Sequence, residues 1–540
     1  MIAGSGRWRR FVVSTFFGLL ALLGVLLHRD YGIPWDEQLD RLNGIINAKY
    51  VALRLAPELA KREENFAVIP DMSENQDADH GVFFQLPLVV LERVVRANDT
   101  RDIYFFRHLV VFFTFVGGVY VFYRLAAHRF ASWRVGLLGA GALVLSPRFF
   151  AEAFYNYKDL VFLTFFTLGI YTLVLFLRRP TWARALVHAA ATGAAIDVRT
   201  MAVLLPVFTL VFAALEALFR PIRRRQFASG LGLYVLVLPL IVILGWPYLW
   251  EHPAEHFVAA FRSFSRYHPS DLLSVYLGQE VLARSLPWHY VPVWLLVTTP
   301  LPYSVLALIG ILVLLRDAVR QGGQWLQTAA NRQDLLFAAW FGGPVLAVIW
   351  FQSVIYDGWR HLYFIYPAFL LLALRGFTAV WPGGWRLKPG DKWLIMRLLR
   401  IGLGMLLVVG VAHTVFRMVR DHPYQNVYFS FLPGPVAERL FERDYWGLSG
   451  WEGMRWILAH DPSPQVTVGT DPRATVMLHN SRLLLPPAER ARVVMSSAAQ
   501  ARYFLTVYRW HPHPYPASYG REVYQIRVNG NKILSVFERP

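Results

Sequence analysis

The sequence predicts a polytopic α-helical membrane protein with a small α/β domain at its C-terminus. Hydrophobic residues make up 55% of the 540 residues and charged residues only 17%, whereas soluble domains average about 45–50% and 25%. The apolar residues also gather in runs long enough to cross a bilayer. This composition excludes disordered, collagen-like and coiled-coil chains. The absence of cysteine excludes disulfides, thiolate metal sites and cysteine nucleophiles.

About eleven apolar runs are candidate membrane spans, although several are shorter than the roughly 20 residues of a perpendicular helix. The first run follows three arginines and ends in Leu27-His28-Arg29-Asp30, with no small-residue cleavage site. We therefore interpret it as an uncleaved span rather than a signal peptide. The least typical runs are 135–150 and 185–196. The eleven runs are 11–27, 103–123, 135–150, 160–177, 185–196, 200–219, 228–245, 291–315, 335–351, 362–374 and 401–416.

The distribution of basic residues predicts the orientation of these spans. With the N-terminus in the cytoplasm, the cytoplasmic segments hold about 22 Lys and Arg and the short outer turns about four, as the positive-inside rule requires. The net charge of +18 is thereby largely explained, and a nucleic-acid partner is not needed. We expect a membrane domain over residues 1–416, with outer loops at 28–102 and 246–290, and an extracytoplasmic domain over 417–540.

The C-terminal segment has the pattern of a folded α/β domain. Residues 451–459 are typical of a helix and residues 465–469 of a strand. Two further strand-like stretches, 523–528 and 532–537, flank Asn529-Gly530-Asn531, which predicts a β-hairpin.

Ionisable residues gather at the outer ends of the predicted spans and are sparse in the middle of the spans. A proton-coupled transporter places such groups near the bilayer centre, facing a pathway. A layer at the outer interface instead suits chemistry on a lipid headgroup whose tail stays in the bilayer. Asp36 and Glu37 open the first outer loop, where a carboxylate could take a proton from an acceptor hydroxyl. The alternative for Asp36 is an N-cap of the helix-compatible stretch 38–60.

Three further outer positions carry cations that could bind a phosphate. Lys158 could bind as a point charge, or extend to water beside neighbouring tyrosines. Arg199 could bind bidentately, or pair with Asp197 in the same short turn. Arg360 could donate to a phosphate oxygen together with His361, or pair with Asp357. The structural and the functional interpretation both remain open for each cation.

Metal binding is not indicated by the sequence. His252 and His256 have the spacing of one helix face, but Pro253 lies between them. We therefore expect no metal site and no resident cofactor.

These motifs, in this order, resemble those of the lipid-phosphate-sugar-dependent membrane glycosyltransferases, the group of protein O-mannosyltransferases and aminoarabinose transferases that shares the GT-C fold. Trp35-Asp36-Glu37 resembles the family's Asp-Glu motif, and His80 lies where the family has a His/Lys-Pro-Pro-Leu-like segment, here without prolines. Residues 148–159, ending in Lys158-Asp159, resemble the Asn-x-Lys-Asp stretch. Arg199 lies where many relatives have a cation near the donor phosphate, and the segment 360–367 resembles the entry into a late span.

The resemblance implies an inverting glycosyltransferase of the bacterial inner membrane, with a periplasmic C-terminal domain and an active site on the outer face. The donor would be a polyprenyl-phosphate sugar, and the acceptor a hydroxyl of a glycan, lipid or protein. Asp36, with Glu37 as its neighbour, would be the base. The lipid phosphate would be bound by Arg199, Arg360, His361 and Lys158, with His80 and Asp159 as further candidates.

Two other classes of function remain open at this point. One is a transporter or flippase of a lipid-linked sugar, favoured by the number of spans. The other is a structural membrane subunit with an outer binding domain. The position of the outer cavity distinguishes the transferase from the transporter: beside Asp36 and Arg360 in a transferase, through the midplane in a transporter.

Overall fold

The computed structural model describes residues 3–539 except 62, 267–271, 382–393 and 510–512. In this part of the chain, nine helices are long and apolar enough to cross a membrane, or ten with one bent pair counted as a span. The chain is thus a multi-pass membrane protein, as predicted. The nine are α1 (Ala3–Leu27), α5 (Thr100–Arg129), α8 (Asp159–Arg178), α10 (Leu204–Phe219), α11 (Arg224–Gly245), α14 (Leu301–Gln321), α15 (Ala329–Trp350), α16 (Tyr366–Val380) and α17 (Leu394–Arg420).

Two of the predicted runs are broken by proline. The run 135–150 is divided into α6 (Trp133–Val144) and α7 (Pro147–Tyr155), which meet at an angle of 71°. The run 291–315 is divided into α13 (Tyr290–Thr298) and α14, with Pro300 between them. Proline lacks a backbone N–H and favours the first turn of a helix, so both helices after the breaks start at or next to a proline.

The predicted span 185–196 corresponds to α9 (Trp182–Ile196), which has 15 residues and is too short to be counted among the nine. It nevertheless packs along α8. Arg184, near its start, donates to the Leu175 carbonyl near the end of α8, and Arg199, just after it, pairs with Asp159 at the start of α8. The segment 184–199, which ends three residues beyond α9, therefore lies along α8 from Leu175 to Asp159.

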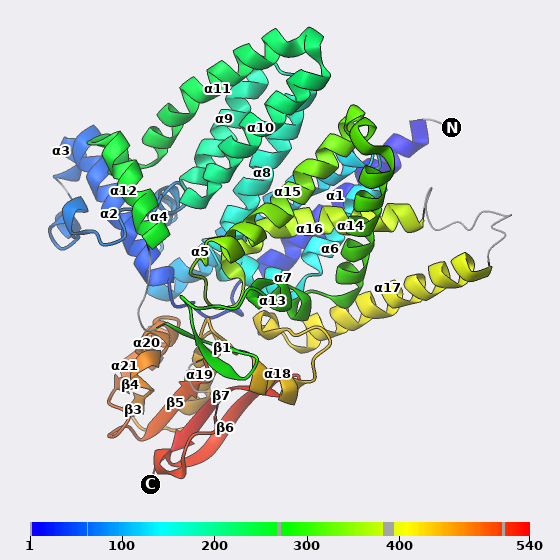
Figure 1. Cartoon of the computed structure of the whole chain (residues 1–540). Helices are drawn as coiled ribbons and strands as arrows, with labels where there is room; N and C mark the ends of the chain where they lie inside the picture. Colours follow the sequence, from blue (N-terminus) through cyan, green and yellow to red (C-terminus); the bar gives the residue numbers. More distant parts are fainter. Residues whose placement is uncertain (1–2, 62, 267–271, 382–393, 510–512, 540) are drawn as a thin grey trace.

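One end of the helix bundle carries most of the remaining structure, and we call it the domain-bearing face. The C-terminal domain packs there, at the end of the bundle away from the N-terminus (Figure 1). Short helices and a small hairpin of the two long loops lie on the same side. These are α2 (Glu37–Leu55), α3 (Pro57–Ala60), α4 (Gln85–Val94), α12 (Pro253–Arg266), β1 (Leu273–Tyr276) and β2 (Gln279–Leu282).

The C-terminal domain contains a five-stranded mixed sheet with strand order β4-β3-β5-β7-β6. The predicted helix, strand and hairpin are confirmed. Asn529 and Gly530 have φ of 51° and 82° between β6 and β7, as a two-residue hairpin turn requires. The elements are α18 (Gly434–Leu440), α19 (Gly450–His460), β3 (Val466–Gly469), α20 (Thr475–Leu483), α21 (Pro487–Arg492), β4 (Val493–Met495), β5 (Tyr503–Val507), β6 (Arg521–Val528) and β7 (Asn531–Glu538).

The segment between α17 and α19 packs into the membrane domain. Arg148 of α7 donates to the Tyr428 carbonyl at 3.1 Å, and the Ser430 amide donates to the Val297 carbonyl of α13 at 2.8 Å. The β1–β2 hairpin contacts the same segment through a bridge between Tyr276 and Phe441. The C-terminal domain is thus attached to the bundle by buried contacts as well as by the chain itself.

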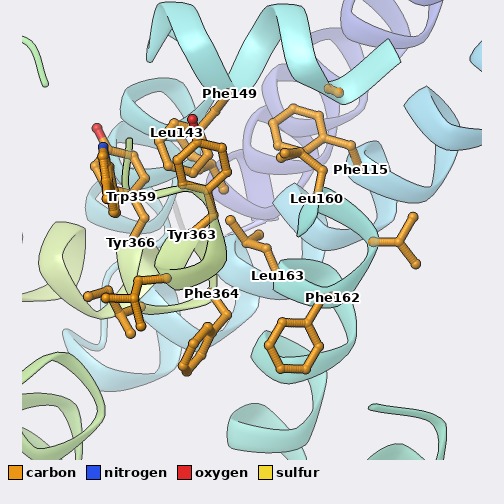
Figure 2. Close-up of a cluster of buried hydrophobic side chains, with 14 of the residues drawn as sticks. Phe115, Leu143, Phe149, Leu160, Phe162, Leu163, Trp359, Tyr363, Phe364 and Tyr366 are labelled. Carbon is orange, nitrogen blue, oxygen red and sulfur yellow. The ribbon is translucent and has the colours of Figure 1, made fainter. Parts of the chain in front are cut away.

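A cluster of aromatic rings fixes the short 3₁₀ helix η7 (Arg360–Ile365) against α7 and α8 (Figure 2). The Phe149 ring stacks on Tyr366 with a centroid distance of 4.1 Å and lies 4.5 Å from Tyr363. Phe364 packs 5.1 Å from Phe162 of α8. Because these rings are buried and closely packed, the start of η7 is fixed beside the start of α8.

Candidate active site

Charged residues from five separate parts of the chain meet at the domain-bearing face. We call this set the arginine–aspartate cluster. Each member lies at or next to the end of a helix or strand, where a side chain can extend beyond the backbone. The members are Asp36 at the start of α2, Asp159 at the start of α8, Arg199 after α9, Asp357 and Arg360 at the start of η7, and Arg509 after β5.

Arg360 lies at the centre of the cluster and is only 3% exposed. Its guanidinium faces three carboxylates: Asp357 at 3.2 Å, Asp159 at 3.3 Å and Asp36 at 3.5 Å. It also lies over the rings of Tyr356 and Trp446, at 5.0 and 4.7 Å from their centroids. All three ion-pair distances exceed the 2.7–2.9 Å typical of charge-assisted hydrogen bonds. The predicted pair with Asp357 is present, but it is one contact among several.

Arg199 pairs with Asp159 and not with Asp197. The Arg199 Nη2–Asp159 Oδ1 distance is 2.5 Å, and both side chains are buried. Arg199 Nε has no hydrogen-bond partner among the described residues, so it retains one donor. The Asp197 side chain is instead fully buried and packs against Gly245, where an added Cβ would collide with its carboxylate. The pair with Asp197, one of the two alternatives for Arg199, is therefore not formed.

Asp36 occupies the N-cap position of α2, but its side chain makes no capping hydrogen bond. Its carboxylate lies beside Arg360 instead, and its side chain is 40% exposed. The carboxylates of Asp159 and Asp357 are 1% and 4% exposed. Asp36 is thus the carboxylate of the cluster that a molecule from solution can reach.

Lys158 and His80 lie next to the cluster and face Asp40, one turn along α2 from Asp36. Lys158 Nζ is 3.4 Å from Asp40 Oδ1, and His80 Nδ1 is 2.9 Å from Asp79 Oδ1. Burial acts to raise the pKa of Asp40, but Lys158 and the Tyr157 hydroxyl outweigh burial and hold that pKa below its ordinary value. The Lys158 side chain therefore contacts a carboxylate rather than only water.

Glu37 lies apart from this arrangement, whereas His361 borders it through Tyr356, the ring that Arg360 also covers. Glu37 is fully buried and pairs with Arg107 at 3.1 Å, with His108 at 3.5 Å on its other oxygen. Arg107 uses its remaining donors for Glu92 and Gln85. The His361 ring packs edge-on against Tyr356 at 4.6 Å, and its Nδ1 has no hydrogen-bond partner in the part of the chain that the structure describes.

Sequence analysis missed the residues that the C-terminal domain contributes. Trp446 covers Arg360, Arg509 pairs with Asp357 at 2.5 Å, and the Tyr445 hydroxyl donates to Glu152 at 2.9 Å. A local signal was present in Asp444-Tyr445-Trp446-Gly447, where two aromatic residues follow a carboxylate. Nothing in that motif indicated a partner in the membrane domain.

Glu442 is a second buried carboxylate beside Asp357. It accepts a hydrogen bond from the Gly358 amide at 3.0 Å and is 3% exposed. Burial raises the pKa of Glu442 to about 8, and the nearby Asp357 charge acts in the same direction, while Arg509 and Arg148 oppose it. The neutral form of Glu442 is therefore favoured near pH 7.

A cavity of about 640 Å³ lies along α2, between Ile46 and Leu53. Its walls come from α2, the loop before α4, and the segment between α11 and α12. They combine aromatic rings with polar side chains, including Tyr50, Tyr248, Gln76, Asp79 and Glu251. Asp79, in the cavity wall, also pairs with His80 at 2.9 Å. Within the described ranges, no group of three His, Asp or Glu side chains could hold a metal ion.

No protein-family model matches the sequence, and no curated protein matches it. Among the solved structures that resemble the whole chain are two of ArnT from Cupriavidus metallidurans. The apo structure has a TM-score of 0.50 at 15% identity and covers 98% of each chain. The structure bound to undecaprenyl phosphate has a TM-score of 0.49 at 14% identity and covers 97% of each chain.

At this level of identity the likeness establishes the fold, and the predicted GT-C fold is confirmed. The chain is a multi-pass membrane protein of that fold with a strand-containing C-terminal domain. ArnT is a protein that it resembles over its full length.

Proposed function

We propose that this protein is an inverting glycosyltransferase that moves a monosaccharide from a polyprenyl-phosphate donor to an acceptor hydroxyl. The observation that carries the proposal is the contact between Arg360 and Asp36. It places a group suited to a lipid phosphate within 3.5 Å of a partly exposed carboxylate suited to act as a base. Both lie at the domain-bearing face, which in this proposal is the periplasmic face of a bacterial inner membrane.

The donor phosphate would bind at Arg360, with Arg199 on the other side of Asp159. As the sugar leaves, negative charge grows on the phosphate, and preorganised guanidinium groups in a site of low dielectric stabilise that charge. The long ion-pair distances around Arg360 support this role, because a phosphate can replace loosely bound carboxylates at its donors. Lys158 and His361 flank the position, and the polyprenyl tail would lie between helices of the bundle.

The acceptor hydroxyl would lose its proton to Asp36 while it attacks the anomeric carbon on the side opposite the phosphate. A single displacement of this kind inverts the configuration at that carbon. A positioned base contributes about 10²–10⁴-fold to the rate. Positioning and phosphate stabilisation must supply the rest.

The acceptor would enter through the cavity along α2. Aromatic rings beside carboxylate and amide side chains are the surfaces that a sugar ring needs, and the cavity lies from Ile46 to Leu53 along the helix that Asp36 precedes. A transporter would require such a cavity to pass through the midplane of the bundle. The position of this cavity at the domain-bearing face therefore favours the transferase over the flippase.

The test is incubation of the purified protein with a panel of polyprenyl-phosphate sugars, with extracted membrane glycans and lipids as acceptors. The proposal predicts release of polyprenyl phosphate that depends on the acceptor. Unchanged donor across the whole panel, with lipid-linked sugar appearing in the opposite leaflet of proteoliposomes, would support a flippase instead.

A further inference from the structure

We propose that Arg509 of the C-terminal domain is a positioning residue that keeps Arg360 available for the donor phosphate, an inference that rests on the proposed function. By neutralising Asp357, Arg509 would prevent that carboxylate from taking all of the donors of Arg360. The C-terminal domain would then be a component of the active site.

The distances around Asp357 carry the argument. Its Oδ1 lies 2.5 Å from Arg509 Nη2, whereas its Oδ2 lies 3.2 Å from Arg360. Charge-assisted pairs typically measure 2.7–2.9 Å, so Arg509 is the close partner of Asp357 and Arg360 the distant one. Asp357 therefore has its charge balanced without Arg360.

Asp159, on the other side of Arg360, has the same arrangement. Its close partner is Arg199 at 2.5 Å, and Arg360 is again farther away at 3.3 Å. Each buried carboxylate beside Arg360 thus has an arginine of its own. Arg360 lies between these two carboxylates, whose charges Arg199 and Arg509 already balance. Its third ion-pair contact is with the partly exposed Asp36.

The pairing of Asp357 with Arg509 matters because both side chains are buried. The side chains of Asp357 and Arg509 are 4% and 8% exposed, and removal of one partner from a buried ion pair leaves an uncompensated charge in a low dielectric. Without Arg509, Asp357 would draw Arg360 into a close pair. Those guanidinium donors would then be lost to a phosphate ligand.

The C-terminal domain positions this loop at two points. Arg509 binds Asp357, and Glu442 accepts the amide hydrogen of the next residue, Gly358, at 3.0 Å. Asp357 and Gly358 have φ of 56° and 70°, in the left-handed region that an aspartate seldom adopts. Arg509 also lies over the ring of Trp35, the residue before Asp36, at 5.3 Å. The same side chain thus contacts both loops that carry Arg360 and Asp36.

The experiment compares donor KM and kcat of four variants in the reconstituted full chain, with undecaprenyl phosphate binding as a second readout. Arg509→Gln should raise the donor KM and the undecaprenyl phosphate Kd by about tenfold, the loss expected for one charged hydrogen bond. Arg509→Gln/Asp357→Asn should return both values to within about threefold of wild type, because the unbalanced carboxylate is gone. Arg509→Lys should stay close to wild type because it keeps the charge. Arg502→Gln, at a half-exposed arginine of the same domain, is the matched control.

A double variant no better than Arg509→Gln would overturn the inference, as would Arg509→Lys being equally defective. If Arg509→Gln does not fold, the double variant and Arg509→Lys still decide the question, because neither leaves Asp357 unbalanced. The undecaprenyl phosphate measurement separates this inference from the proposed function. Wild type that binds the lipid but transfers no sugar refutes the transferase, whereas unchanged binding in Arg509→Gln refutes the role of Arg509.

Discussion

Arg360 Nη2 lies 3.5 Å from Asp36 Oδ2, so the first loop after α1 and the start of η7 meet in one ion pair. The two side chains differ in exposure: Arg360 is buried and Asp36 is partly open. A donor whose phosphate binds Arg360 would therefore lie next to Asp36, the carboxylate that could take the proton of the acceptor hydroxyl. The proposed chemistry depends on this contact more than on any other in the structure.

Replacement of Arg360 should impair donor use more than folding. Arg360→Lys keeps a charge but loses the planar fork that faces three carboxylates, so we expect the donor KM to rise by about tenfold or more. Arg199→Ala should weaken donor use in the same way. Steady-state kinetics over a range of donor concentrations gives both values.

The matched control for Arg199 is Asp159→Asn, because Asp159 and not Asp197 is its partner. If the arginines only balance buried carboxylates, Asp159→Asn and Asp357→Asn should be at least as damaging as the arginine variants. Loss of activity in the aspartate variants alone would contradict the phosphate-binding role.

Glu37→Gln should affect stability first. Glu37 is fully buried against Arg107, so neutralising it leaves part of a buried cation uncompensated, at a cost of about 3 kcal/mol. We expect a clear decrease in Tm in detergent, measured by intrinsic tryptophan fluorescence during heating. Glu58→Gln, at a side chain that is 80% exposed, should leave Tm unchanged. A stable Glu37→Gln protein without activity would instead indicate that Glu37 takes part in the chemistry.

The raised pKa of Glu442 predicts a pH dependence of stability. The folded protein favours the protonated form up to about pH 8, whereas the unfolded chain loses that proton near the ordinary value of 4.5. The unfolded state therefore binds fewer protons between these values, and stability falls as pH rises, by up to about 1.4 kcal/mol per pH unit from this group. In Glu442→Gln this contribution should be absent. The measurement is the Tm of wild type and of Glu442→Gln from pH 5 to 8.5. Parallel curves of Tm against pH would contradict the raised pKa of Glu442.

Much of the fold could be predicted because its signals are local. Apolar runs indicate helices that cross a membrane, and Asn529-Gly530 indicates a tight hairpin from two residues alone. The breaks in two predicted runs also have local causes, since Pro147 and Pro300 divide runs whose hydropathy is continuous. The short α9 was predicted only because its residues are apolar, and its position along α8 became clear from the contacts of Arg184 and Arg199.

The candidate site could be predicted only in part because its pairings join distant residues. Asp197 was one of two alternatives for Arg199 because it is a sequence neighbour, but the start of α8 brings Asp159 to Arg199 instead. Adjacent residues can also face different environments: Asp36 faces the cluster, while Glu37 points into the buried contacts of Arg107. No local pattern relates Arg509 to Asp357, because the whole membrane domain must fold before they meet.

The orientation in the membrane is a separate prediction. Residues 220–225 should face the cytoplasm and the C-terminal domain the periplasm, because cytoplasmic loops are rich in Lys and Arg. The chain has no native cysteine, so single cysteines placed at Ile222 and at Arg521 give clean labelling sites. A membrane-impermeant maleimide applied to intact cells should label only the second. Labelling of the first alone would place the candidate site on the cytoplasmic side.

The most direct test of the proposed function is the turnover of Asp36→Asn. Asparagine keeps the size of the side chain and remains a good N-cap, and Asp36 makes no capping hydrogen bond that it could lose. We therefore expect polyprenyl phosphate release to fall by about 10²-fold or more, as for loss of a positioned base, while undecaprenyl phosphate binding and Tm stay near wild type. Near-normal release of polyprenyl phosphate by Asp36→Asn would contradict the assignment of Asp36 as the base and with it the proposed chemistry.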